Sequence, residues 1–164
     1  MAVLTTGKKA PAISLADANG QRMSLADALK KGPVALAFFK VECPVCQFTF
    51  PFIERIHKAY GSANFTFWGI SQDDARDTHD FLKEYGINFP ALIDERGYPV
   101  SNQYGITNVP TVFLISPDGQ IQVSSVGFEK AALEKIAAEA ARANEKPAGV
   151  LFKPSEAIPA YKPG

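Results

Sequence analysis

Two cysteines in this 164-residue sequence stand close enough to do chemistry together, Cys43 and Cys46. They are the only cysteines in the chain. A disulfide between them would close so short a loop that it would add little stability. Thiols at this spacing can instead exchange electrons with other disulfides, because one thiolate attacks a disulfide sulfur and its neighbour then displaces the product. The pair therefore predicts redox chemistry.

The residues around the pair predict where it lies. An apolar run over residues 34–39 has the length and composition of a strand covered on both faces. Residues 44–60 then carry apolar side chains at helical spacing. Cys43 is thus expected at a helix N-terminus, where unpaired N–H groups and the helix dipole favour a thiolate. We expect Cys43 to attack and Cys46, one turn further in and more buried, to resolve the mixed disulfide.

The rest of the chain predicts an α/β fold in three layers, a central mixed sheet flanked by helices. Residues 7–29 form an N-terminal β-hairpin extension with its turn at Asn19-Gly20, leading into a short helix over 25–30. A β-α-β unit followed by a β-β-α unit comes after it. Strands are expected at 65–70, 91–93, 111–115 and 120–126, and helices at 74–85, 100–104 and 128–144.

One domain over residues 1–144 accounts for these elements. Residues 145–164 contain four prolines and show neither helical nor alternating periodicity. They are expected to form an irregular, Pro-rich C-terminal tail.

The charge balance limits the partners. Lys plus Arg and Asp plus Glu each total 17, so no basic surface is expected for nucleic acid or an anionic membrane. No stretch approaches the roughly 20 apolar residues of a spanning helix, and the first residues lack the apolar core of a signal peptide. These features favour a cytoplasmic protein with a reducing role. A periplasmic protein is the alternative if the natural start lies elsewhere.

The cysteine pair has two other interpretations. It could be half of a zinc site, or two small buried residues. Zinc needs four ligands, and the two histidines, His57 and His79, stand apart from each other and from the cysteines. The strand-to-helix position favours the redox dithiol. No metal and no cofactor are expected.

Further residues give the sequence a family resemblance. Residues 7–11 are Gly-Lys-Lys-Ala-Pro, residues 43–46 are Cys-Pro-Val-Cys, Pro51 stands five residues after the second cysteine, and residues 109–111 are Val-Pro-Thr. With these motifs, residues 7–144 resemble the thioredoxin superfamily in its redoxin or TlpA-like branch, which neighbours the AhpC/TSA peroxiredoxins.

The resemblance implies where a substrate docks. In the family, the proline of the Val-Pro-Thr type element is cis and faces the dithiol, and the backbone before it pairs with the substrate's cysteine segment. Pro110 is then the cis proline and Val109 the docking edge, with Pro44 and Val45 also contacting substrate. A trans proline opening an edge strand is the alternative.

Two departures from thioredoxin concern proton transfer. Thioredoxin has a buried Asp six residues before its first cysteine and a Trp directly before it, whereas this chain has Ala37 and Glu42 there. Glu42 and Lys40 are the nearest titratable groups. Of these, Glu42 is the candidate catalytic residue, because it adjoins the motif.

A peroxidase is the rival function. Pro44-Val45-Cys46 resembles the peroxidatic loop of peroxiredoxins, with Cys46 as the thiol that attacks peroxide. That family has Thr or Ser three residues before this cysteine and Pro seven before, where this chain has Cys43 and Phe39. The Arg with which that family polarises its substrate is replaced here by Pro110. These substitutions favour a thiol-disulfide oxidoreductase.

The expected partners are protein disulfides or dithiols and an upstream thiol reductant or reductase. A non-catalytic binding module on the same fold is the third alternative, since fold alone does not fix function.

Overall fold

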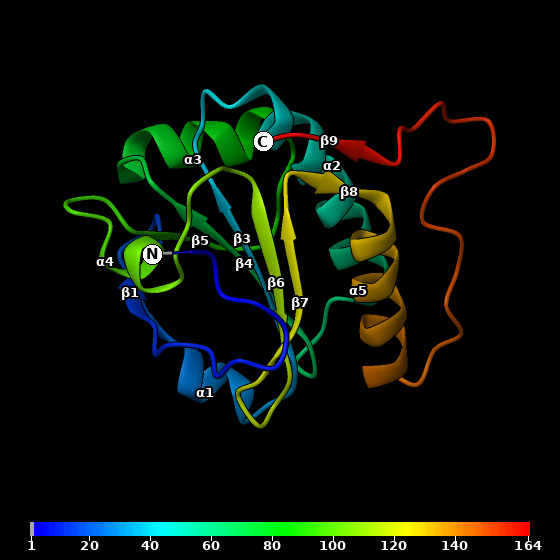
Figure 1. Ribbon diagram of the computed structural model, residues 1–164, viewed down its shortest axis with the longest axis horizontal. Helices are drawn as coiled ribbons and strands as arrows, with labels where there is room; N and C mark the ends of the chain where they lie inside the picture. The colour runs from blue at the N-terminus through cyan, green and yellow to red at the C-terminus, as the bar shows by residue number, and fades with distance from the viewer. Residues whose placement is uncertain (1) are drawn as a thin grey trace.

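The computed structural model describes residues 2–164. At its centre is a five-stranded mixed sheet with the strand order β5-β4-β3-β6-β7 (Figure 1). Strands β3, β4 and β5 are parallel to one another. Strand β6 pairs antiparallel with β3, and β7 pairs antiparallel with β6. The strands of this sheet are β3 (Val34–Phe39), β4 (Thr66–Ser71), β5 (Ala91–Ile93), β6 (Thr111–Ile115) and β7 (Ile121–Val126).

Helices and an extra hairpin cover both faces of the sheet. Side chains of β3 alternate between two hydrophobic cores, as expected of a central strand buried on both sides. One core is covered by α2 (Pro44–Tyr60), α3 (Ala75–Glu84) and α5 (Lys130–Ala143). The other is covered by the N-terminal segment, α1 (Leu25–Leu29) and α4 (Pro99–Gln103). The predicted three-layer thioredoxin-like fold is therefore confirmed.

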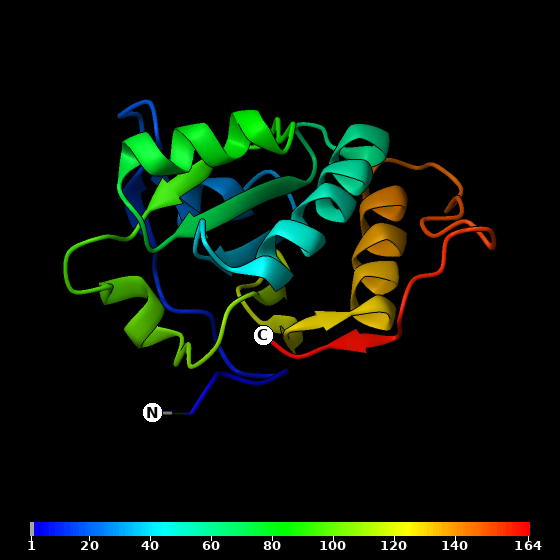
Figure 2. The same cartoon turned by 90° about the horizontal axis from the view of Figure 1, so that it is seen from above.

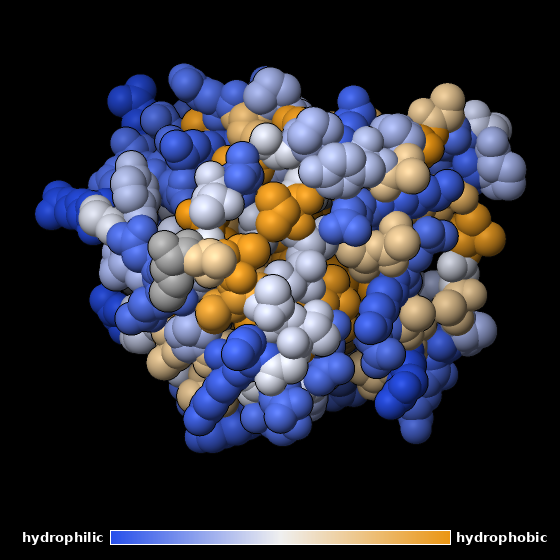
Figure 3. All heavy atoms as spheres, in the orientation of Figure 1, coloured by the Kyte–Doolittle hydropathy of each residue, from blue (hydrophilic) through white to orange (hydrophobic). Residues whose placement is uncertain are grey.

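The N-terminal hairpin is also confirmed. It consists of β1 (Ser14–Ala16) and β2 (Arg22–Ser24), paired antiparallel. Ser24 then caps α1, because its hydroxyl accepts a hydrogen bond from the Asp27 N–H. The face seen in Figure 3 is mostly hydrophilic, with hydrophobic side chains gathered near its centre.

The C-terminal part differs from the sequence prediction at two places, the start of the helix predicted over 128–144 and the end of residues 145–164, which were predicted to be irregular but contain a strand. The predicted helix 128–144 was wrong at its start, because Phe128–Glu129 is a strand, β8, that pairs antiparallel with β9 (Tyr161–Lys162). This partner lies more than thirty residues away in sequence, so local periodicity could not indicate it. Residues 145–160 contain no helix or strand, and in Figures 1 and 2 they swing out past α5 before β9 returns to β8.

Within residues 2–164, no helix combines the length and the apolar character needed to cross a membrane.

Candidate redox site

Cys43 lies at the N-terminus of α2. It has extended backbone angles and is the N-cap residue, and its Sγ accepts a hydrogen bond from the Cys46 N–H at 3.1 Å. Pro44 follows at the first helical position, where its missing N–H costs nothing. The unpaired N–H groups and the dipole at a helix N-terminus stabilise negative charge that develops there. Cys43 is half-buried, so a partner can reach it.

Cys46 lies behind Cys43 and is fully buried, with 0% of its surface exposed. Burial raises the pKa of the Cys46 thiol well above its ordinary value, and the adjacent Cys43 raises it further. Neither cysteine is in a disulfide in this structure. The two thiols therefore differ in access, with Cys43 within reach of a partner and Cys46 held as a protonated thiol.

The Asp73 carboxylate contacts the loop before the dithiol and acts electrostatically on the buried Cys46. Its Oδ2 accepts a hydrogen bond from the Val41 N–H at 2.8 Å, just before the dithiol. Its negative charge is a further, smaller cause of the raised pKa of Cys46. Gln47 fixes the same loop by donating from Nε2 to the Val41 carbonyl at 2.9 Å. The loop that leads into Cys43 is thus held by groups from α2 and from the end of β4.

The Val109–Pro110 peptide bond is cis, as the resemblance implied. Because β3 and β6 are antiparallel, with Phe38 opposite Thr111, the end of β3 meets the start of β6 beside the dithiol. The Cys43 S–H donates to the Val109 carbonyl at 3.4 Å. Cys43 is thereby placed between the N-terminus of α2 and the backbone of Val109.

A polar cavity of about 260 Å³ adjoins Val109 on the side of α4. Its polar lining includes Lys40, Gln72 and Asn108. The cavity is linked to Cys43 only through Val109, whose carbonyl accepts the Cys43 S–H.

The predicted site residues do not all come together. Cys43, Cys46, Val109 and Pro110 meet as described, and Pro44 and Val45 lie between the cysteines as the first turn of α2. Glu42 is exposed, and none of the ion pairs found among residues 2–164 includes it. Its catalytic role stays a prediction.

Sequence reasoning missed Asp73. A usable signal was present, because Asp73 comes two residues after β4, which is parallel to β3. Carboxyl ends of neighbouring parallel strands share one edge of a sheet, so an acid after β4 should lie near the loop after β3.

No group of three or more His, Cys, Asp or Glu side chains able to hold a metal ion is found among residues 2–164. The dithiol therefore has no visible set of co-ligands in the described part of the chain.

A dithiol that opens a helix and faces a cis proline, on a sheet of this order, defines a protein of the thioredoxin superfamily in its redoxin branch. A family model described as "AhpC/TSA family" matches residues 6–124. The chain belongs to the AhpC/TSA family.

Individual relatives point in the same direction. The thiol-disulfide oxidoreductase ResA of Bacillus subtilis is 33% identical over 119 residues, which make up 72% of this chain and 65% of ResA. The chain thus spans slightly less than two thirds of the length of that relative. The thiol:disulfide interchange protein of Chlorobium tepidum is a solved structure with a TM-score of 0.69 and 28% identity, covering 84% of this chain and 99% of that one.

A peroxidase structure shares the fold as well. Peroxidoxin BcpB of Mycobacterium tuberculosis has a TM-score of 0.71 and 24% identity, covering 85% of this chain and 97% of that one. At that identity the likeness shows the fold alone. The choice between disulfide exchange and peroxide chemistry depends on the site.

Proposed function

We propose that the chain is a thiol-disulfide oxidoreductase that exchanges electrons with protein disulfides through Cys43 and Cys46. The observation that carries this proposal is the position of Cys43. It is half-buried at the N-terminus of α2, its Sγ accepts the Cys46 N–H, and it contacts the backbone of Val109. The names of the similar thiol-disulfide oxidoreductases support it.

The proposed reaction has two exchange steps. The Cys43 thiolate attacks one sulfur of a substrate disulfide, forms a mixed disulfide and releases the other substrate sulfur, which takes up a proton. Cys46 then loses its proton and attacks Cys43 Sγ, which closes the Cys43–Cys46 disulfide and releases the second substrate thiol. The substrate gains two electrons, and an upstream thiol reductant restores the dithiol.

The second step needs a proton acceptor, because burial holds Cys46 in its protonated form. We assign this task to Asp73, whose charge acts on Cys46 and whose Oδ1 is not used in holding Val41. Glu42 is the competing acid, and substitution of each distinguishes them.

The peroxidase alternative needs Cys46 to be a thiolate that peroxide can reach. Cys46 is fully buried and its pKa is raised, and both properties oppose that role. Cys43 and Pro110 also stand where a peroxiredoxin has its hydroxyl and its Arg.

The proposal is tested by measuring reduction of insulin disulfides with dithiothreitol as electron donor, alongside consumption of hydrogen peroxide. We expect insulin reduction, lost in Cys43→Ser, and no rapid peroxide consumption. Rapid peroxide loss that disappears in Cys46→Ser but persists in Cys43→Ser would establish the peroxidase instead. Absence of both activities would favour the binding module.

A further inference from the structure

The residues of β9 and those after it lie against the redox site. A Cβ built on Gly164 would come within 2.5 Å of the Val109 carbonyl oxygen, the same atom that accepts the Cys43 S–H. A Cβ built on Gly127, which has a φ of +83°, would overlap the Lys162 carbonyl oxygen. Two glycines therefore let the backbone of residues 161–164, here named the covering segment, pack directly on the edge next to Cys43.

The covering segment is held by specific contacts. Phe128 pairs with Lys162 and Glu129 with Tyr161 in the β8–β9 ladder. The Lys162 ammonium also lies 4.8 Å from the centroid of the Phe48 ring, on the helix that begins with the dithiol. Phe48 is half-buried, so this contact covers apolar surface near the site.

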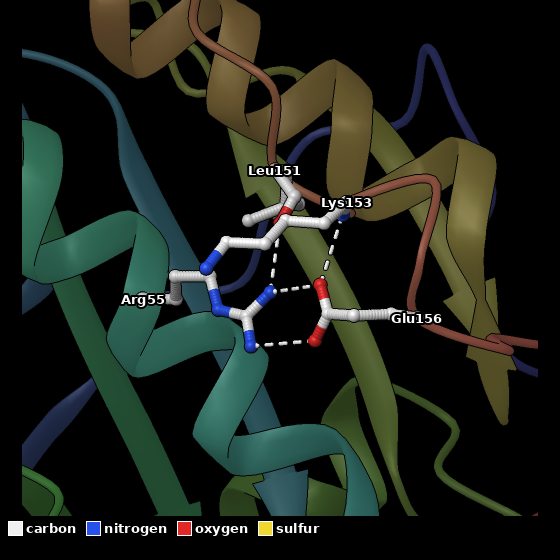
Figure 4. Close-up of polar contacts among 4 residues, drawn as sticks. All are labelled: Arg55, Leu151, Lys153 and Glu156. Atoms are coloured by element: carbon white, nitrogen blue, oxygen red, sulfur yellow. Dashed lines mark hydrogen bonds and ion pairs between the residues drawn. The ribbon is translucent and has the colours of Figure 1, made fainter.

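The chain leading to the covering segment is anchored further along α2. Arg55 binds the Glu156 carboxylate through two contacts, at 2.8 and 3.0 Å, and donates to the Leu151 carbonyl at 2.9 Å (Figure 4). Phe152 is buried against Phe52. These contacts fix where the chain turns back toward β8.

A disulfide sulfur that reacts with Cys43 must come to bonding distance of its Sγ, which is 3.4 Å from the Val109 oxygen. The backbone that flanks this disulfide in a polypeptide therefore comes close to Val109. Gly164 already lies there, and Lys162 lies beside Phe48. A small disulfide has no flanking chain and avoids this conflict.

We propose that the covering segment occupies the backbone-docking place of a protein substrate, so that the intact chain favours small disulfides and a protein disulfide must displace residues 161–164. The inference rests on the proposed function and names its substrate preference. Because only molecules with a free edge can bind a protein substrate, the covering segment lowers the apparent affinity for that substrate in proportion to the fraction of molecules in which the edge is free.

The test compares two substrates, insulin and bis(2-hydroxyethyl) disulfide, in the full chain. Gly164→Val places a branched side chain against the Val109 carbonyl and should dislodge the covering segment without altering the dithiol. We expect insulin reduction to rise about tenfold, the factor that a preference of about 1.4 kcal/mol would give. Reduction of the small disulfide should stay within about twofold, because its affinity does not depend on the edge.

Gly149→Val is the matched control, the same substitution in the same tail. Its Cβ would meet only the Tyr60 hydroxyl, at 3.1 Å, far along the chain from Val109. It should change neither rate. Deletion of residues 161–164 is the second variant, and it should reproduce the effect of Gly164→Val. Faster hydrogen exchange of the Lys130 amide, which donates to the Ala160 carbonyl, reports displacement.

Unchanged insulin reduction in the deletion variant would overturn the inference. Failure of the intact chain to reduce either disulfide would contradict the proposed function, and the inference would then be judged by alkylation of Cys43. A maleimide joined to polyethylene glycol should react faster after the deletion while iodoacetamide reacts equally. Equal acceleration of both reagents, or of neither, would contradict the covering role.

Discussion

The two sides of the dithiol are built differently. On the open side, Cys43 is half-buried and faces the backbone of Val109. On the closed side, Cys46 has no exposed surface and lies near the charge of Asp73. Two chemically identical thiols three residues apart thus have different surroundings. The difference fits the proposed roles, attack by Cys43 and later resolution by Cys46.

The difference also shows what the helix contributes. The N-terminus of α2 supplies an N–H to Cys43 Sγ, while the same helix carries Cys46 one turn inward, among the apolar side chains of the core. The proposed order of attack follows from the position of each cysteine on one helix. Each prediction below would remove or sharpen this asymmetry, beginning with the largest expected effect.

Replacing each thiol in turn should give unequal results. Cys43→Ser should lower disulfide reduction by about 1,000-fold or more, because the nucleophile is gone. Cys46→Ser should still attack but stop at the mixed disulfide, which mass spectrometry of the unreduced protein would detect. Accumulation of a mixed disulfide in Cys43→Ser, and not in Cys46→Ser, would reverse the assigned roles.

Removing the charge of Asp73 should slow the resolving step. Asp73→Asn keeps an oxygen that can accept the Val41 N–H but loses the proton acceptor, so we expect resolution to slow by about 10- to 100-fold. Stopped-flow measurement of substrate release from the mixed disulfide isolates this step.

Glu42→Gln is the control for that variant. Glu42 is exposed, so its substitution should change the same rate by no more than about twofold. If Glu42→Gln slows substrate release from the mixed disulfide more than Asp73→Asn does, Glu42 and not Asp73 is the proton acceptor.

The raised pKa of Cys46 should make the reduced protein less stable in alkali. Above the ordinary thiol pKa of 9.0, the unfolded chain loses the Cys46 proton while the folded chain keeps it. The stabilisation is therefore complete below that pH and is lost as the pH rises. At pH 10 the free energy of unfolding should fall by about 1.4 kcal/mol from this group.

Urea unfolding at pH 7 and pH 10 measures this loss, with Cys46→Ser as reference. Tyr104, whose pKa burial also raises, is present in both proteins, so its contribution cancels. An equal pH dependence of the two proteins would show that Cys46 ionises as easily in the fold as outside it.

The smallest effect is expected at the anchor of the tail. Arg55 holds the pKa of Glu156 at about 2, below its ordinary value of 4.5. The contribution of this pair to stability is therefore present above pH 4.5 and lost as the pH falls toward 2. Glu156→Gln should abolish this acid dependence, with a slightly lower stability near neutral pH and no change near pH 2, as thermal unfolding at both pH values would show.

Much of the fold could be predicted from local patterns. The apolar run over 34–39 matches β3, and the helical spacing over 44–60 matches α2, because both segments contribute to a core through their own periodicity. The placement of Cys43 at the N-cap follows directly from that junction. The resemblance supplied the cis Val109–Pro110 bond, which residue pattern alone left open.

The contacts between distant segments could not be predicted in the same way. Local periodicity predicts a helix that includes Phe128, and it carries no sign of the strand partner, Lys162, far along the chain. The position of Asp73 near the dithiol depends on the parallel pairing of β3 with β4, which no local pattern shows. Glu42 adjoins the motif in sequence, yet its side chain is exposed. Adjacency in sequence was thus a weaker guide to the site than adjacency in the sheet.

The central claim is that the half-buried thiol of Cys43 attacks and the fully buried thiol of Cys46 resolves. Its most direct test is the rate of alkylation of each cysteine in the reduced protein at pH 7 with iodoacetamide, resolved by peptide mass spectrometry. We predict that Cys43 reacts at least about 100-fold faster than Cys46, since Cys46 is buried and protonated. Equal rates, or faster alkylation of Cys46, would contradict the account.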